Sequence, residues 1–235
     1  MRALVITLFV LILLVVGVDI GGRAFAQAKV ADAIAAQTTA TNRPAVSIHG
    51  LSFLAQAVPG RYGKVTVGWT ALILGPVRDV TATIDFSDVR YPLSDAFRGT
   101  VDQLVAGRAD LTASIPLTSV TAALNVPGVT LRAGAGGRLE VRAPVIPGGP
   151  ALDLSADVRA QVVGNSLRLT AANLRAPGTA PALPGVVTAL LERSLVLDLP
   201  LDSLPLTVHA ATVTAVGDHL EVAAQASDVR ASELR

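Results

Sequence analysis

The chain has 235 residues, of which 51% are hydrophobic, 16% charged and only 3% aromatic, and it contains no cysteine. With 19 Lys and Arg against 18 Asp and Glu, the formal net charge is +1, so no overall field attracts nucleic acid. The absence of cysteine excludes disulfide bonds, cysteine-bound zinc and thiol catalysis.

The N-terminus carries Arg2 and then an uninterrupted apolar run over residues 3–18. As a helix this run spans about 24 Å, somewhat less than the ~30 Å hydrocarbon core of a bilayer. The pattern predicts export, with residues 1–22 as a signal peptide or as an uncleaved membrane anchor, and residues 24–26 offer an A-x-A cleavage motif. A buried N-terminal helix is less favoured, because a core helix normally carries a polar stripe.

Two further segments follow this run. Residues 23–43 are predicted to be a weakly amphipathic helix, with Phe25, Val30 and Ile34 on one face, and a polar connector. Residues 44–235 contain no Ser/Gly-rich linker and no block of charge, so they are predicted to form a single domain.

Within that domain, apolar and polar residues alternate along several segments, which predicts strands of an antiparallel sheet covered on one side only. The clearest alternation occurs over residues 80–87, 152–159 and 167–172. Three short segments resemble a turn followed by the second arm of a hairpin; these are residues 137–141, 164–169 and 218–222.

Helical segments are few after residue 44. Leu117, Val120 and Leu124 have helical spacing between Pro116 and a Pro-Gly stop at 127–128, and a second amphipathic helix follows Pro184. Because the apolar face of a sheet must be covered, two or three short helices give thin cover for so many aliphatic strand positions.

No motif for catalysis or metal binding is present. His49, His209 and His219 are isolated and lack metal-ligand spacing. The paired acidic residues lie on the polar strand face, where a carboxylate keeps an ordinary pKa. The sequence therefore predicts a protein that is not an enzyme, with no cofactor, no metal and no nucleic-acid partner. Its arginines are candidates for bidentate contacts with lipid phosphates, and the sequence alone does not choose among them.

Residues 46–67 follow the pattern V-x-I-x-G, then F-L, then G-R-Y, then V-x-V. In these residues the chain resembles the LmeA-like family of actinobacterial phospholipid-binding envelope proteins. The resemblance extends over the exported part, including a closing strand over residues 197–206 and a last hairpin with the letters H-L-E-V.

This resemblance implies an α+β fold in which a long curled antiparallel sheet wraps around one or two helices, as in the half-barrel of tubular lipid-binding proteins, after the N-terminal signal or anchor helix. It implies a phospholipid-binding protein of the periplasm or cell envelope, for envelope biogenesis or lipid transport, with phospholipid and membrane as partners. The N-terminal helix, if retained, anchors it to the outer leaflet of the plasma membrane.

The segment Gly50–Val65 is expected to form one lip of an aliphatic groove, with Ser52 capping a one-turn helix and Pro59-Gly60 ending it. Tyr62 and Trp69 are expected at its rim, and a packed core corner is the alternative. The predicted lipid-binding residues are Phe53, Leu54, Val58, Tyr62, Trp69, Val187, Leu190 and Leu191.

Two other functions remain open at this point. One is a membrane-anchored scaffold that pairs its apolar face with a protein partner, and the other is an envelope hydrolase. The missing catalytic residues make the hydrolase the weaker of the two. Lipid that copurifies with the protein would distinguish a lipid-binding protein from a scaffold.

Overall fold

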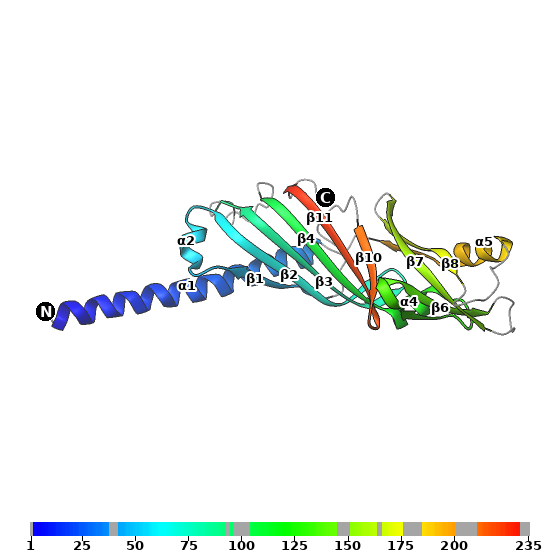
Figure 1. Cartoon of the computed structure of the whole chain (residues 1–235). Coiled ribbons are helices and arrows are strands. Elements are labelled where there is room, and N and C mark those ends of the chain that lie inside the picture. Colours follow the sequence, from blue (N-terminus) through cyan, green and yellow to red (C-terminus); the bar gives the residue numbers. More distant parts are fainter. Residues whose placement is uncertain are drawn as a thin grey trace.

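A computed structural model describes residues 2–37, 42–92, 95, 104–144, 151–163, 166–175, 185–200 and 211–230, and among these the side chains of residues 2–12, 37, 151–152, 186–187 and 190 are not described. The described chain is α+β and elongated, with two antiparallel sheets that follow each other along the molecule (Figure 1). The predicted fold class, with a strongly curled half-barrel sheet, is confirmed.

The first sheet has six strands in the order β1-β2-β3-β4-β11-β10. Its strands pair antiparallel throughout. Strands β2 and β3 shift register near Ala71 and Asp79, which adopt positive φ values of 54° and 58°. Bulges of this kind increase the twist and help the sheet to curl. The bounds are β1 Ala45–His49, β2 Arg61–Leu74, β3 Val77–Arg90, β4 Val105–Pro116, β10 Ala211–Val216 and β11 His219–Arg230.

The second sheet has five strands in sequential order, β5-β6-β7-β8-β9. The eight-residue helix α4 (Leu117–Leu124) follows β4 directly and leads into this sheet, and α5 (Gly185–Ser194) precedes β9. Both helices were predicted from spacing and are confirmed. The remaining bounds are β5 Thr130–Ala133, η1 Ala135–Gly137, β6 Leu139–Pro144, β7 Ala151–Val163, β8 Ser166–Arg175 and β9 Val196–Pro200. The rest of the closing strand expected over residues 197–206 lies outside the described residues.

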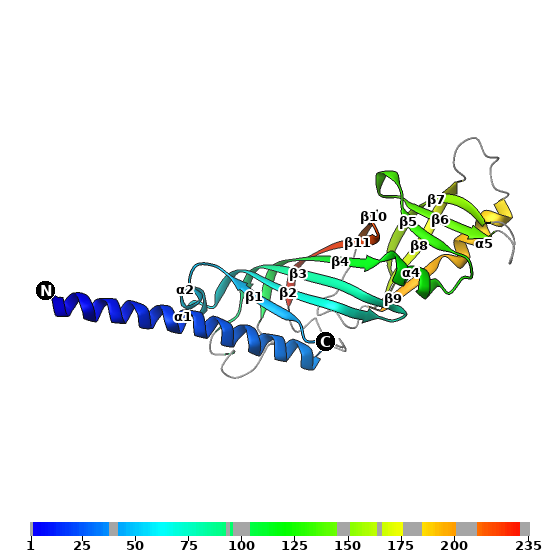
Figure 2. The same cartoon turned by 90° about the horizontal axis from the view of Figure 1, so that it is seen from below.

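The N-terminal helix α1 (Arg2–Gln37) is continuous, so residues 2–22 and the helix expected after them form one helix. Its second half lies along β1, the edge strand of the first sheet, and its first half extends beyond the sheet (Figure 2). Within the part of the chain that the structure describes, no helix has an apolar stretch long enough to cross a membrane. The first part of the apolar run, residues 3–12, lies outside the described side chains.

Burial alternates along the strands as the sequence predicts. In β1, Val46 and Ile48 are buried between exposed neighbours, and β6 repeats the pattern. The buried residues of both sheets form one continuous cluster, to which α1 contributes Ala31. The apolar side of each strand therefore faces a shared interior, and the polar side faces solvent.

Candidate functional site

An apolar cleft lies where the two sheets meet, between α4 and the five-stranded sheet. It has a volume of about 30 Å³, room for little more than a water molecule. Its walls come from both sheets and from α4; the lining residues are Val120, Leu124, Leu131, Leu139, Val158, Leu169, Thr170, Ala171, Leu195, Leu197 and Leu220.

The helix α4 closes this cleft, and its ends are set by local sequence. It starts after Pro116, whose φ of −59° suits a helix start, and it ends at Asn125 in the left-handed conformation. Leu117 and Val120 are buried, and the helix contacts β3 and β4 on one side and β5 and β9 on the other. It is a short plug between the sheets.

A larger, open and polar hollow adjoins the cleft beneath α5. It has a volume of about 510 Å³, within the range of ligand pockets. Arg159 of β7 and the α5 residues Glu192 and Arg193 line it, and none of the three side chains forms a hydrogen bond or ion pair in the described structure. Its other lining residues are Thr170, Ala171, Ala172, Asn173, Ala189 and Val196.

The cleft and the hollow share Thr170 and Ala171 of β8. Successive side chains of a strand point to opposite faces, and Ala171 is buried while Thr170 is partly exposed. The pairing of β8 with β9 ends at Thr170, where Val196 is its partner. The apolar cleft and the hollow with its two arginines therefore adjoin on either side of the β8–β9 edge, where Thr170 and Ala171 line both.

Neither the cleft nor the hollow is an elongated aliphatic groove of the kind expected from the resemblance, so that groove stays a prediction. The sheet faces are well covered by side chains, and the cleft as it stands is too small for an acyl chain. The strand residues are better covered than the short helices alone would allow, because α1 and the partner sheet also bury them. Binding of an acyl chain therefore requires the cleft to widen.

The structure places Phe53 and Tyr62 of the α2 region in a packed corner. Helix α2 (Phe53–Ala57) carries Phe53, which is buried 6.3 Å from the Tyr62 ring, centroid to centroid. Trp69 is only 1% exposed, an interior rather than a rim position. Leu54 is partly buried, whereas Val58 is 75% exposed. Contact of these residues with lipid stays a prediction.

The other predicted residues lie on α5. Leu191 is buried at 9% exposure, and the side chains of Val187 and Leu190 lie outside the described residues. Because α2 and α5 lie at opposite ends of the molecule (Figure 1), the structure does not bring the two predicted groups into one site. The sequence analysis did not predict the cleft residues. Their alternation indicates buried positions, and no local signal distinguishes a core residue from one that lines a cleft.

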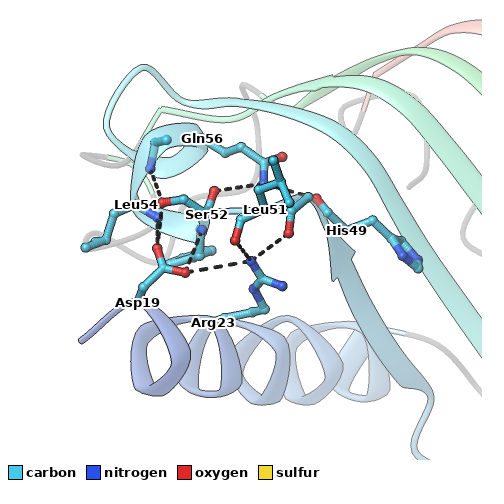
Figure 3. Close-up of polar contacts among 10 residues, drawn as sticks. Asp19, Arg23, His49, Leu51, Ser52, Leu54 and Gln56 are labelled. Atoms are coloured by element: carbon cyan, nitrogen blue, oxygen red, sulfur yellow. Dashed lines mark hydrogen bonds and ion pairs between the residues drawn. The ribbon is translucent and has the colours of Figure 1, made fainter. Parts of the chain in front are cut away.

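Residues 50–58, here called the α2 corner, are bonded to α1 through a polar cluster (Figure 3). Asp19 of α1 accepts hydrogen bonds from the backbone N–H of Leu54 at 2.7 Å and of Phe53 at 3.0 Å, and from the Ser52 hydroxyl at 2.8 Å. Arg23, one turn later, donates to the Gly50 carbonyl oxygen at 2.9 Å. Asp19 thus caps the free N–H groups of α2.

Two glycines let the chain approach closely here. A Cβ on Gly60, whose φ is +65°, would lie 2.8 Å from the Tyr91 carbonyl oxygen, and a Cβ on Gly22 of α1 would lie 3.3 Å from the Phe53 ring. Only glycine suits the first position. Because Gly22 has no side chain, α1 can pack closely against the Phe53 ring of α2.

The Asp19 cap makes the α1–α2 contact sensitive to pH. The N–H groups of Leu54 and Phe53 hold the pKa of the Asp19 carboxyl below its ordinary value of 3.8. A lowered folded-state pKa contributes stability that is present above the ordinary value and is lost as pH falls through the folded-state pKa. We expect Asp19→Asn to lower the melting temperature at neutral pH.

The difference between Asp19→Asn and the parent protein should shrink as pH falls below 3.8, as followed by circular dichroism melts over an acid pH series. The matched control is Asp32→Asn. Asp32 lies on the same helix as Asp19 and forms one exposed ion pair, with Arg43 beyond the helix, so its loss should have little effect. An Asp19→Asn deficit that is the same at every pH would contradict the capping role.

His49 and His219 are the histidines that the structure describes, and each has a local partner. The described residues contain no group of three or more His, Asp or Glu side chains placed to hold a metal ion. His49 contacts the Thr66 hydroxyl at 2.9 Å, and His219 pairs with its neighbour Asp218. His209 lies outside the described residues.

Comparison with known proteins gives one positive result. A family model described as LmeA-like phospholipid-binding matches residues 17–225 of the chain. No curated protein and no solved structure gives a significant match.

Proposed function

Because the chain belongs to the LmeA-like phospholipid-binding family, we propose that it is a non-enzymatic protein that holds phospholipid acyl chains in the cleft between its two sheets. Its role is cell-envelope biogenesis or lipid transfer. The observation that carries this assignment is the adjacency of an apolar cleft and a hollow with unpaired arginines at Thr170 and Ala171.

Burial of the acyl chain supplies the driving force. Each methylene moved from water to an apolar surface gains ~0.8 kcal/mol of transfer free energy, so burial of a sixteen-carbon chain gains about 12 kcal/mol. A bilayer shelters the same chain almost as well, so the net affinity is modest and loading is reversible. Movement of α4 away from β5 and β9 is the simplest way to admit the chain, because α4 is the short plug of the cleft.

The phosphate of the lipid lies in the polar hollow. Arg159 and Arg193 are the cations there without partners in the described structure, and guanidinium groups bind phosphate through two parallel hydrogen bonds. Glu192 in the same hollow disfavours a second anion. A singly charged phosphodiester therefore fits better than a phosphomonoester.

The N-terminal segment supports a location at a membrane. The all-apolar run over residues 3–18 and the family membership support export to the periplasm or cell envelope. Retained, this segment anchors the protein to the outer leaflet of the plasma membrane, and the sheets then lie within reach of bilayer phospholipid.

The first test is a search for bound lipid. The full chain is purified without detergent, extracted with organic solvent and analysed by mass spectrometry, and transfer of a labelled phospholipid from vesicles is measured. We expect copurified phospholipid and transfer above the rate without protein. If neither is found, the apolar surfaces serve a protein partner, and the scaffold function replaces this one.

The arginines provide a second test. Arg159→Gln combined with Arg193→Gln should weaken binding of labelled phosphatidylglycerol about tenfold or more, because hydrogen bonds to charged groups contribute about 1.5–3 kcal/mol. The matched control is Arg132→Gln on β5, which is exposed and does not line the hollow. Equal weakening by the control would assign the effect to overall charge and would remove the phosphate site.

A further inference from the structure

Two large apolar side chains stand in solvent at the α2 corner. Leu51, just before α2, is 106% exposed, and Val58, just after it, is 75% exposed. No other large apolar side chain among the described residues is as exposed as either of them. Both flank a helix whose own Phe53 and Ala57 are buried, so the outward position of Leu51 and Val58 is imposed by a well-packed corner.

This corner lies where the apolar half of α1 leaves the sheet. From Leu13 to Ile20 the large side chains of α1 are exposed all around the helix, a distribution typical of a helix in an apolar surrounding. Asp19 and Arg23 bond the backbone of residues 50–54. These bonds hold the exposed helix next to Leu51 (Figure 3), and Val58 follows at the other end of the short helix α2.

Basic residues stand beside the apolar pair. Arg61 begins β2 and lies opposite Arg90, the last residue of β3. The two strands are joined further at this edge by the Tyr91 N–H, which donates to the Gly60 carbonyl oxygen at 2.9 Å. Both arginines are exposed, and in the described structure neither forms a hydrogen bond or ion pair. Two unpaired cations next to exposed aliphatic side chains match an anionic bilayer surface.

We propose that the α2 corner is a bilayer-contact surface, formed by Leu51 and Val58 and flanked by Arg61 and Arg90. The proposal rests on the membrane anchor of the proposed function, and it adds a second point of contact. Leu51 and Val58 enter the boundary between headgroups and acyl chains, and the arginines meet lipid phosphates. The Asp19 cap then fixes the sheets at a set orientation to the membrane instead of leaving them on a free tether.

The absence of cysteine allows a direct test with single-cysteine variants of the full chain. Leu51→Cys and Val58→Cys are labelled with the environment-sensitive dye NBD and reconstituted into vesicles of mixed phosphatidylcholine and phosphatidylglycerol. Ile73→Cys and Val216→Cys carry the same dye at exposed apolar positions of β2 and β10 and serve as matched controls.

We expect blue-shifted emission and quenching by shallow spin-labelled lipid at positions 51 and 58, and neither at positions 73 and 216. Arg61→Gln with Arg90→Gln should reduce the blue shift in the mixed vesicles and leave it unchanged in pure phosphatidylcholine. Labels at 51 and 58 that stay in water, while the protein still floats with the vesicles, would overturn the proposal and leave the anchor intact.

Two further outcomes also overturn it. A blue shift that develops without vesicles as protein concentration rises would show that a second copy covers the corner. An equal shift at all four positions would show general adsorption. Phospholipid loading of the cleft, measured by mass spectrometry on the same variants, should not change; loss of loading in every variant and in the parent protein would instead refute the proposed function.

Discussion

Val158→Trp is expected to reduce the phospholipid that copurifies with the protein about tenfold or more. Val158 lines the cleft from β7, opposite Ala171 of β8, and it is only partly buried, so a larger side chain can be accommodated. A ring placed there excludes at least two methylenes of an acyl chain, which is about 1.6 kcal/mol and thus roughly a factor of ten. Mass spectrometry of organic extracts measures the ratio of lipid to protein.

Val162→Trp is the control for this variant. Val162 lies on the same strand and the same face, is also partly buried, and pairs with Leu167 outside the cleft lining. Its lipid content should stay near that of the parent protein. Val158→Ala, which widens the cleft, should keep or increase loading. Equal loading in Val158→Trp and Val162→Trp, with both melting temperatures unchanged, would remove the cleft from the lipid site.

Trp69→Ala should cost about 3–5 kcal/mol of unfolding free energy, the usual range for loss of a fully buried aromatic side chain. Trp69 is 1% exposed in the middle of β2, where it pairs with Ala82 of β3. Chemical unfolding followed by circular dichroism measures the change. The variant has no tryptophan left, since Trp69 is the only one in the chain.

Trp69→Phe should cost much less, within about 1.5 kcal/mol of the parent protein. The indole Nε1–H of Trp69 is buried without a hydrogen-bond partner among the described residues, and an unpaired buried donor costs about 1–3 kcal/mol. Removal of this group offsets part of the lost packing. Ile73→Ala, at an exposed position of the same strand, should stay within about 0.5 kcal/mol; a comparable loss there would show that the Trp69 effect is not specific to the core.

Most of the elements followed from the sequence, because the patterns that define them are local. Alternation in β3, β7 and β8 fixed which side of each strand is buried, and the spacing of Leu117 and Val120 gave α4. The candidate site did not follow. A strand's alternation shows which face is apolar and not which strand will lie beside it, so the split into two sheets and the insertion of β11 between β4 and β10 could not be read from it.

The sequence by itself determined the aliphatic interior, the apolar N-terminal run and the family resemblance, since composition and short-range periodicity carry them. The tertiary structure decided that Val120, Val158 and Leu220 line one cleft, that Trp69 is buried, and that Asp19 caps a helix 34 residues later in the chain. Each of these is a contact between distant segments, and such contacts depend on how whole faces pack together, which no local pattern encodes.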